Sequence, residues 1–328
     1  MKKLILYCLC LIGLVTGFYF LLRSGTKVGS DRYQVGEEMK ISRSPDLPVP
    51  ALCGYQTEFA VPSGEEDVNA DGFSKSCPVF IMVDNETKNV VAAKNVYRRI
   101  YPASTTKIMT AILVLDAVEE GKFGLNDVIT LQHDTVVEDP DAVASDLNEG
   151  CSITVRNLLH GLLIRSYNDY AIILSELVAG SESDFVDLMN AKAEEFGMTG
   201  THYENPHGLH DPGHYTTAYD MYILMRKASA YPLIEEIDQN HSYTYEYTNA
   251  AGETLTDDIS PTNMYLSGNA ELPSNIRIQE WKTGTTSQAG HVLTMNCLID
   301  DGEYTIYCAE YDDTEELYSD YSMLFNLR

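Results

Sequence analysis

Apolar residues follow two different patterns along this chain, and the change of pattern divides it into parts. Short apolar blocks bounded by turn residues, which are typical of strands, occur over residues 79–93 and again over 277–309. Between them, and again after residue 314, apolar residues recur three or four positions apart, as in amphipathic helices. Strands near both ends predict an α+β fold, with an antiparallel sheet built from both chain ends and a mainly helical subdomain inserted between them.

The individual elements are bounded by turn and cap residues. The expected strands are 79–83, 90–93, 277–283, 291–299 and 303–309, with a polar hairpin made of 242–248 and 253–257. The expected helices are 108–118, one that begins at 154, 170–179, 183–196, 217–228 and 314–326. If Asp301 and Gly302 form a two-residue turn, Cys297 lies opposite Ile306 and diagonal to Cys308. A disulfide between the two cysteines would have poor geometry, and the alternative is a pair of small buried residues.

The N-terminal segment has no such periodicity and carries a long apolar run. Residues 4–22 are uncharged, and at about 1.5 Å rise each they just span a hydrocarbon core of roughly 30 Å. We interpret them as a transmembrane anchor, with a signal peptide as the alternative. Residues 1–3 would then be a cytoplasmic start. The rest of the chain is expected on the extracytoplasmic side of the cell membrane.

Residues 23–75 contain stretches rich in proline, glycine and acidic residues, which is typical of a flexible spacer. Residues 76–328 are expected to form the one folded domain. Five cysteines lie beyond the predicted anchor, and an odd number leaves at least one unpaired. Cys53 and Cys77 flank a polar segment and are one candidate pair.

The charge of the chain excludes two classes of partner. Lys and Arg number 22 against 49 Asp and Glu, which gives a net charge of −27. Nucleic acid and anionic lipid surfaces both require a basic face, so neither is expected as a partner. An anionic substrate would have to be bound by a few local cations, for which Lys107, Lys282 and Arg165 are candidates.

Two short motifs place hydroxyl groups next to polar partners. Ser104 and Lys107 are three residues apart at the start of an apolar helix, so they share one helix face. A serine hydroxyl needs a base to become a nucleophile, and a lysine with a depressed pKa can act as one. Ser166 and Asn168 lie at a junction between two helices and could reach into a cleft. Taken singly, both motifs have an ordinary explanation as cap and turn residues.

A third motif, Lys282-Thr283-Gly284, ends a predicted strand. An ammonium, a hydroxyl and a backbone without a side chain suit the capture of a peptide that ends in a carboxylate. The ordinary explanation is an edge strand protected by a lysine.

Ser-x-x-Lys, Ser-x-Asn and Lys-Thr-Gly in this order are the signature of penicillin-binding proteins and serine β-lactamases. Residues 100–111, 205–209, 214–221 and 282–290 resemble segments of the serine-type D-alanyl-D-alanine carboxypeptidases, which are low-molecular-mass penicillin-binding proteins. The likeness runs from about residue 78 to the end. It implies a β-lactamase/transpeptidase-like fold, and it implies that residues 76–328 form a penicillin-binding D,D-peptidase domain.

The resemblance also implies a role for each motif residue. Ser104 would be the acylated nucleophile and Lys107 its general base. Ser166 would pass a proton to the leaving amine, and Asn168 would bind the substrate amide.

On the third motif, Lys282 would favour a neutral Lys107 and would bind the terminal carboxylate together with Thr283. Gly284 would let the substrate backbone approach, and the backbone amides of Ser104 and Thr285 would form the oxyanion hole. No cofactor and no metal is implied.

The implied function is removal of the terminal D-Ala from peptidoglycan stem peptides by a membrane-anchored serine D,D-carboxypeptidase, with β-lactams as covalent inhibitors. Three alternatives stay open: a D,D-endopeptidase acting on crosslinks, a non-hydrolytic penicillin-binding or sensor protein, and a β-lactamase. A β-lactamase needs a carboxylate after Asn168 to activate water, and Glu204 is the one candidate by position.

Several residues depart from the family pattern or need a separate interpretation. Trp281 occupies a position where a small or β-branched residue is expected, and its side chain should point away from that of Lys282. No basic residue lies near Thr262, where many relatives carry one that helps to bind carboxylate. The loosely spaced His207, His210 and His214 are interpreted as structural loop residues rather than metal ligands, and Asp139 as part of a solvated loop.

Overall fold

The computed structural model of the chain describes residues 59–62, 67–73, 78–137, 139 and 142–327. The predicted cytoplasmic start and anchor, residues 1–22, and the candidate pair Cys53 and Cys77 lie outside these described residues. No helix in the described part of the chain is both long and apolar enough to cross a membrane.

Two short pieces of the predicted spacer are described, and both contact the folded domain. The backbones of Val68 and Ala93 exchange two hydrogen bonds of 2.8 Å, and Ala60 N donates to Tyr222 Oη at 3.1 Å. The division of the chain at residue 76 stays a prediction.

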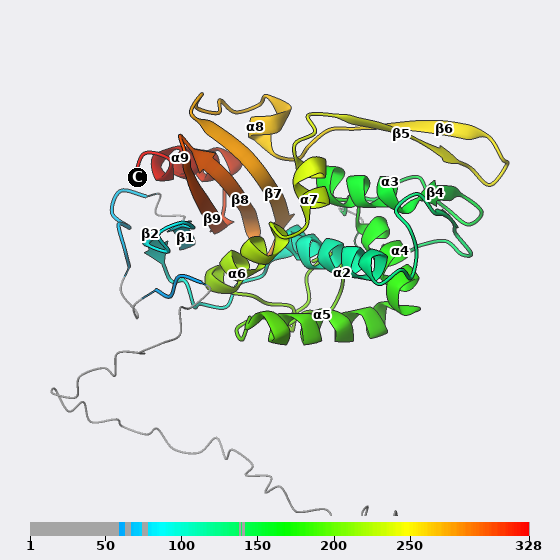
Figure 1. Cartoon of the computed structure of the whole chain (residues 1–328), viewed down its shortest axis with the longest axis horizontal. Helices are drawn as coiled ribbons and strands as arrows, with labels where there is room; N and C mark the ends of the chain where they lie inside the picture. Colours follow the sequence, from blue (N-terminus) through cyan, green and yellow to red (C-terminus); the bar gives the residue numbers. More distant parts are fainter. Residues whose placement is uncertain (1–58, 63–66, 74–77, 138, 140–141, 328) are drawn as a thin grey trace, which may run out of the picture. The chain divides into compact units, whose positions relative to one another are not determined.

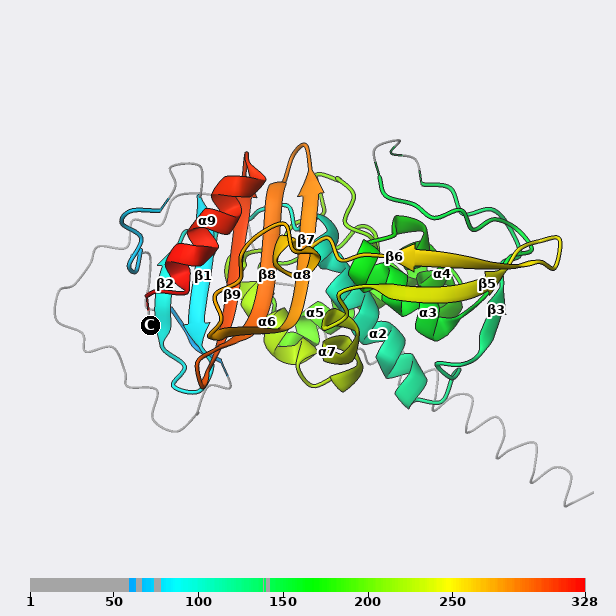
Figure 2. The same cartoon turned by 90° about the horizontal axis from the view of Figure 1, so that it is seen from above.

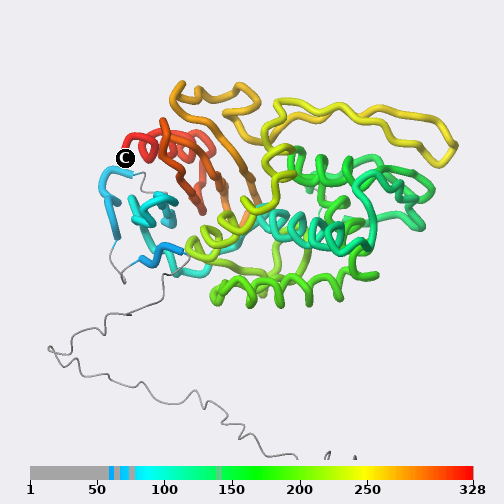
Figure 3. Tube along the Cα trace, viewed as in Figure 1, coloured from blue at the N-terminus to red at the C-terminus, as the bar shows by residue number. Residues whose placement is uncertain are grey.

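A five-stranded antiparallel sheet forms the centre of the domain, in the order β2-β1-β9-β8-β7. Its strands are β1 (Val79–Asp84), β2 (Val90–Lys94), β7 (Ile276–Thr286), β8 (Gly290–Ile299) and β9 (Gly302–Tyr311). Val79 pairs with Ala309, so the first strand lies beside the last one (Figures 1 and 3). The predicted sheet from both chain ends is therefore confirmed.

The sheet separates two apolar cores because successive side chains of a strand point to opposite faces. In β1, Val79 and Ile81 join one core, whereas Phe80 and Met82 join the other. Figure 2 shows α9 (Thr314–Leu324) crossing one face, near the short α8 (Met264–Ser267). The other face packs against α6 (Ala218–Ala228), and α2 (Lys107–Glu119) packs against α6 in the same core.

The helical subdomain continues from α2 with α3 (Val155–His160), α4 (Asn168–Ala179) and α5 (Glu182–Phe196), and α7 (Pro232–Asp238) follows α6. Side-chain caps set several helix starts. Thr154, Ser181 and Thr217 each accept a hydrogen bond from the backbone N–H three residues later, at 3.2, 3.0 and 3.0 Å. Such caps satisfy N–H groups that have no partner inside the helix.

A second sheet has the order β3-β4-β5-β6, with strands β3 (Val128–Thr130), β4 (Ser152–Thr154), β5 (Tyr243–Thr248) and β6 (Thr254–Ile259). The predicted hairpin forms its outer half, β5–β6. The pattern of apolar residues did not predict β3 and β4, since a strand of three residues is too short to show alternation.

The hairpin that joins β8 to β9 has a different register from the predicted one. Its turn lies at residues 300–301, so Cys297 lies opposite Tyr304 and not opposite Ile306. Asp300 adopts a φ of 52°, which a tight hairpin turn requires and which aspartate tolerates. Cys297 is a free thiol, so no disulfide joins it to Cys308, and burial raises the pKa of Cys297 to about 12.

Candidate active site

The turn before α2 holds Ser104 at the head of that helix. A short 3₁₀ turn, Ala103–Thr106, runs directly into α2, and Ala103 adopts a φ of 48°. Lys107 is the first residue of α2 and lies one turn beyond Ser104. Ser104 is half-buried, whereas Lys107 is fully buried. The predicted pair therefore shares one helix face, with the hydroxyl toward solvent and the amine behind it.

The Lys107 amine lies among three oxygen atoms. Nζ is 2.9 Å from Ser104 Oγ, 2.7 Å from Asn168 Oδ1 and 2.7 Å from the backbone O of His207. The amide of Asn168 is oriented by its other end, because Nδ2 donates to Val143 O at 2.9 Å. Two of the three oxygens around Nζ thus belong to carbonyl groups, which only accept hydrogen bonds.

The charge of Lys107 is unfavourable at this position. Burial holds the pKa of Lys107 well below its usual range, and the neighbouring Lys282 lowers it further. Asp169 acts in the opposite direction, but its own pKa is raised by burial. The surroundings of Lys107 therefore favour the neutral amine, the form that can accept a proton.

The Ser166–Asn168 motif lies where α3 ends and α4 begins. A π-helical turn, Gly161–Arg165, follows α3, and Ser166 then adopts a left-handed φ of 69°. Such turns are frequent at functional sites because they redirect the chain within a helix. Ser166 Oγ is buried and has no hydrogen-bond partner among the described residues. Val143 O fixes both the backbone and the side chain of Asn168, since it accepts from Asn168 N and from Asn168 Nδ2 at 2.9 Å each.

Strand β7 carries the third motif along the edge of the sheet. Lys282 is fully buried, and its Nζ donates to Thr283 O at 3.0 Å. Burial lowers the pKa of Lys282 to about 7. A Cβ placed on Gly284 would lie 2.9 Å from both Ala103 Cβ and Ser104 N, so β7 approaches the Ser104 turn more closely than any side chain would allow.

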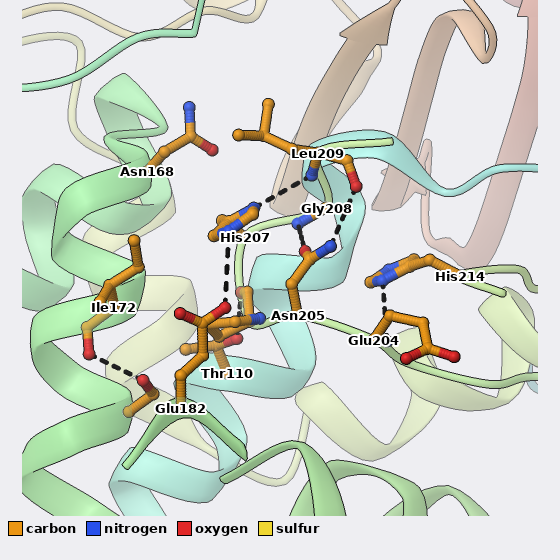
Figure 4. A network of polar contacts seen from close by, with 12 residues as sticks. Thr110, Asn168, Ile172, Glu182, Glu204, Asn205, His207, Gly208, Leu209 and His214 are labelled. Carbon is orange, nitrogen blue, oxygen red and sulfur yellow. Dashed lines mark hydrogen bonds and ion pairs between the residues drawn. The ribbon is translucent and has the colours of Figure 1, made fainter. Parts of the chain in front are cut away.

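A loop of residues 205–209 packs against the Ser104 turn and completes the surroundings of Lys107. Figure 4 shows the hydrogen bonds within this loop. Asn205 Oδ1 accepts from Gly208 N at 2.6 Å, and Asn205 Nδ2 donates to Leu209 O at 3.0 Å. His207 Nδ1 accepts from Leu209 N at 3.1 Å, so a neutral His207 carries its proton on Nε2, which lies 3.7 Å from Glu182 Oε1. Burial lowers the pKa of His207 to about 3. The loop thereby presents the backbone O of His207 to Lys107 while that histidine stays uncharged.

The motifs meet at a cleft of ≈ 490 Å³. Six of the eight predicted site residues line it: Ser104, Ser166, Asn168, Thr283, Gly284 and Thr285. Lys107 and Lys282 lie behind the wall. Among the described lining residues none is Lys or Arg, and the predicted candidate Arg165 is exposed elsewhere.

The cleft also contains residues that the sequence motifs did not indicate. His291 Nδ1 lies 3.1 Å from Thr285 Oγ1 and 3.2 Å from Thr314 Oγ1, and Leu317 and Tyr318 of α9 extend the wall. They come from β8 and α9, which are adjacent to β7 only in the folded sheet. Asp139 is exposed, as a solvated loop requires, but it also lines the cleft.

Three further positions stand out in the sequence, and the structure places each of them. Trp281 packs in the core on the α9 face of the sheet, and its ring centroid is 5.9 Å from Lys282 Nζ. Thr262 shares a hydroxyl–hydroxyl hydrogen bond with Thr283 and lines the cleft without adding charge. Glu204 lies outside the cleft lining and pairs with His202 at 3.2 Å.

The other two loop histidines, His210 and His214, contact neighbouring residues of the domain. His214 Nε2 lies 2.8 Å from Thr106 Oγ1, and its Nδ1 accepts from Glu204 N at 3.1 Å. The His210 ring stacks edge-on against Tyr101.

Comparison with protein families gives one match over most of the domain. The family model described as D-alanyl-D-alanine carboxypeptidase matches residues 67–306. The D-alanyl-D-alanine carboxypeptidase DacF of Bacillus subtilis is 32% identical over 215 residues, which cover 65% of this chain and 52% of the relative. A D-alanyl-D-alanine endopeptidase of Pseudomonas aeruginosa is 31% identical over 219 residues, which cover 67% of this chain and 66% of the relative. The chain spans about half the length of the curated carboxypeptidases that it matches.

Solved structures share the fold. A cefotaxime-bound penicillin-binding protein of Listeria monocytogenes superposes with a TM-score of 0.65 at 24% identity, over 78% of this chain and 98% of that one. A Streptomyces DD-transpeptidase superposes with a TM-score of 0.70 at 24% identity, over 77% of this chain and 97% of the other. The β-lactamase/transpeptidase-like fold expected from the sequence is therefore confirmed.

Proposed function

This chain belongs to the D-alanyl-D-alanine carboxypeptidase family, and on that premise we propose that it is a serine D,D-carboxypeptidase that removes the terminal D-Ala from peptidoglycan stem peptides. The supporting observation is the set of oxygens around Lys107 Nζ. A neutral amine has two N–H groups and one lone pair, and the carbonyl oxygens of Asn168 and His207 each accept one N–H. The lone pair is then free to accept the hydroxyl proton of Ser104, whose Oγ lies 2.9 Å from Nζ.

The reaction follows from this arrangement. Ser104 Oγ attacks the carbonyl carbon of the penultimate D-Ala while its proton passes to Lys107. The backbone amides of Ser104 and Thr285 stabilise the oxyanion, and each such donor is worth about 10²–10³ in rate. The carbon–nitrogen bond then breaks, and the leaving amine takes a proton through Ser166. Water hydrolyses the acyl-enzyme and releases the shortened peptide.

The remaining features of the proposal concern recognition and location. Asn168 binds the substrate amide, Thr283 binds the terminal carboxylate, and Lys282 contributes its positive charge from behind the wall. β-Lactams acylate Ser104 and inhibit the enzyme. Residues 4–22 anchor the chain in the cell membrane with the catalytic domain on the extracytoplasmic side, which is the side where peptidoglycan lies.

Covalent labelling tests the assignment of Ser104. Ser104→Ala should abolish modification by a fluorescent penicillin, because the variant has no nucleophile. Ser183→Ala, on α5 and away from the cleft, is the control and should label as the wild type does. Label that persists on another residue of Ser104→Ala, located by mass spectrometry, would refute the assignment.

A second experiment separates the carboxypeptidase from its alternatives. Incubation with a Lys-D-Ala-D-Ala peptide should release one D-alanine, whereas cleavage of a crosslinked dimer alone would establish the endopeptidase activity named for the Pseudomonas relative. A β-lactamase would turn nitrocefin over rapidly, and the absence of both acylation and hydrolysis would establish a non-hydrolytic protein.

The role of Lys282 in carboxylate recognition gives a further prediction. Lys282→Ala should lower kcat/KM for a peptide with a free terminal carboxylate about tenfold more than kcat/KM for the matched neutral ester. The charge of Lys282 acts from behind the wall on that carboxylate as well as on Lys107, whereas with the ester it acts on Lys107 alone. Equal losses on both substrates would contradict a carboxylate role for Lys282.

A further inference from the structure

Thr110 on α2 carries a hydroxyl that the proposed reaction does not use. The residue is fully buried and lies one helical turn beyond Lys107, so the two side chains share a face of α2. A threonine inside a helix commonly donates its hydroxyl to a carbonyl of its own helix, three or four residues earlier. Thr110 Oγ1 instead donates to Pro206 O, in the loop of residues 205–209, at 2.6 Å.

Side chains of α2 thereby bind two consecutive carbonyl groups of this loop. Thr110 donates to Pro206 O, and Lys107 Nζ lies 2.7 Å from His207 O. Figure 4 shows Thr110 below His207. Each carbonyl belongs to a planar peptide group, and the two planes are joined only by the φ and ψ rotations of His207. A bond that fixes the first carbonyl therefore restricts the direction of the second.

The peptide group that carries His207 O is also held at its other end. In a trans peptide the C=O and the N–H point in opposite directions, and the N–H of this group, that of Gly208, donates to Asn205 Oδ1 at 2.6 Å. Residues 205–209, all of them described, belong to no helix or strand, so regular backbone hydrogen bonding does not fix this carbonyl. Its direction depends instead on Thr110 and Asn205.

The direction of the hydrogen bond between Lys107 and Ser104 depends in turn on His207 O. While Asn168 Oδ1 and His207 O each accept one N–H of the neutral amine, its lone pair faces Ser104 Oγ. If His207 O withdrew, a buried N–H would lack an acceptor, which is unfavourable. The remaining oxygen of the three is Ser104 Oγ, and an amine that donates to this oxygen cannot accept its proton.

We propose that Thr110 is a positioning residue that sets His207 O against Lys107 and thereby keeps the lone pair of the amine directed at Ser104. The kinetic part of this inference rests on the proposed function, whereas its structural part rests on the contacts of the loop. Thr110 is not among the described residues that line the cleft. It should therefore affect the rate of acylation and not the binding of the ligand that precedes it.

The test compares Thr110→Val with Thr110→Ser. Valine has nearly the shape of threonine but no hydroxyl, whereas serine keeps the hydroxyl. Acylation of the full-length chain in detergent micelles is followed over a range of fluorescent penicillin concentrations. This gives the rate constant at saturation and the dissociation constant of the initial complex. Thr110→Val should lower the rate constant about tenfold or more and change the dissociation constant less than about twofold, and Thr110→Ser should restore the rate constant to within about threefold of wild type.

A matched variant separates positioning from stability. Thr305→Val removes the hydroxyl of another fully buried threonine, which bonds to Asn296 Oδ1 at 2.6 Å and lies outside the described cleft lining. It should lower resistance to urea and leave the rate constant of acylation unchanged. The proposal would be overturned by an unchanged rate constant in Thr110→Val, by an equal loss in Thr110→Ser, or by a loss that reflects only a smaller fraction of molecules able to be labelled.

A second readout does not depend on activity. In a crystal structure of Thr110→Val, His207 O should lie beyond hydrogen-bonding distance of Lys107 Nζ, and a carbonyl that stays in place would overturn the proposal. If Thr110→Val does not fold, Thr110→Cys decides, because a thiol is only a weak donor. Its rate constant should be about threefold or more below that of Thr110→Ser, and equal values would overturn the proposal. If wild type is not acylated at all, the proposed function fails, while crystal structures of these variants still test the position of the carbonyl.

Discussion

The backbone conformation of individual residues decides where the Ser104 hydroxyl lies. Ala103 has a φ of 48°, and Gly208 of the loop beneath it has a φ of 86°. A Cβ on Gly208 would lie 1.9 Å from Ala103 O, which no rotation of a side chain could relieve. The position of the nucleophile therefore depends on a glycine that is 104 residues away in sequence from Ser104.

Gly208→Ala should therefore unfold the domain or displace the Ser104 turn. We expect a loss of about 3 kcal/mol or more in the free energy of unfolding, because backbone strain and overlap with Ala103 add together. Gly121→Ala is the control: it has a similar φ of 74° but no atom within 4 Å of the added Cβ, so it should cost about 1 kcal/mol. Urea denaturation of both variants measures the difference, and equal losses would show that the contact with Ala103 is unimportant.

At the residue scale, the sequence was informative where chemistry depends on residue type at a fixed spacing. Ser104 and Lys107 could be paired from one helical turn, and the structure places them 2.9 Å apart. It was uninformative where a side chain enters the site from a distant segment. Leu317 and Tyr318 of α9 line the cleft, although in the sequence they look like ordinary residues of an amphipathic helix.

At the scale of elements, the hairpin β5–β6 supports the loop that carries Ser166 and Asn168. Tyr167, between these two residues, donates its hydroxyl to Asp257 Oδ2 of β6 at 3.1 Å. Tyr245 of β5 donates to the same oxygen at 2.7 Å. The hairpin thus holds the middle residue of the motif, Tyr167, in place.

Tyr167→Phe should slow acylation more than it destabilises the fold. Loss of one hydrogen bond should cost about 1 kcal/mol of unfolding free energy, while a more mobile Ser166 should lower the acylation rate about three- to tenfold. Tyr243→Phe is the matched control, because the Tyr243 hydroxyl of the same hairpin donates to Asn157 at 2.9 Å, away from the motif. Equal acylation rates in the two variants would contradict a supporting role for the hairpin.

Helices and strands differ in how much of them could be predicted from the sequence. Cap residues such as Thr154 and Thr217 indicated helix starts to within a residue, because a side-chain oxygen there has a definite partner. The short helices α7 and α8 were not predicted, since seven and four residues are too few for a helical period to show. The register of β8–β9 was wrong because two acidic residues form the turn in place of the Asp-Gly pair.

For the whole molecule, the net charge of −27 works against every anionic substrate. The described cleft lining has no Lys or Arg, and the two lysines of the site lie buried behind it. Attraction is therefore confined to the last few ångströms of the approach, while repulsion acts over the whole surface.

Salt should consequently accelerate acylation by an anionic penicillin. Raising the ionic strength from 10 to 300 mM shortens the screening length from about 30 Å to below 8 Å. We expect the second-order rate constant to rise about two- to fivefold, in contrast to the usual slowing of attractive encounters. A neutral ester of the same penicillin is the control and should show no change; a fall in the rate of the anionic compound would show that local cations dominate the encounter.

The pairing of β1 with β9 has a consequence for the time at which this domain acquires its structure. Val79 and Ala309 are neighbours in space, so β1 and β2 have no place in the sheet until the ribosome has delivered nearly all of the domain. Contacts of such long range form slowly, and a chain that is still incomplete exposes the apolar face of β1. Until residues 302–311 have emerged, nascent chains should remain open to chaperones and proteases, and the Ser104 turn should be unable to react with penicillin.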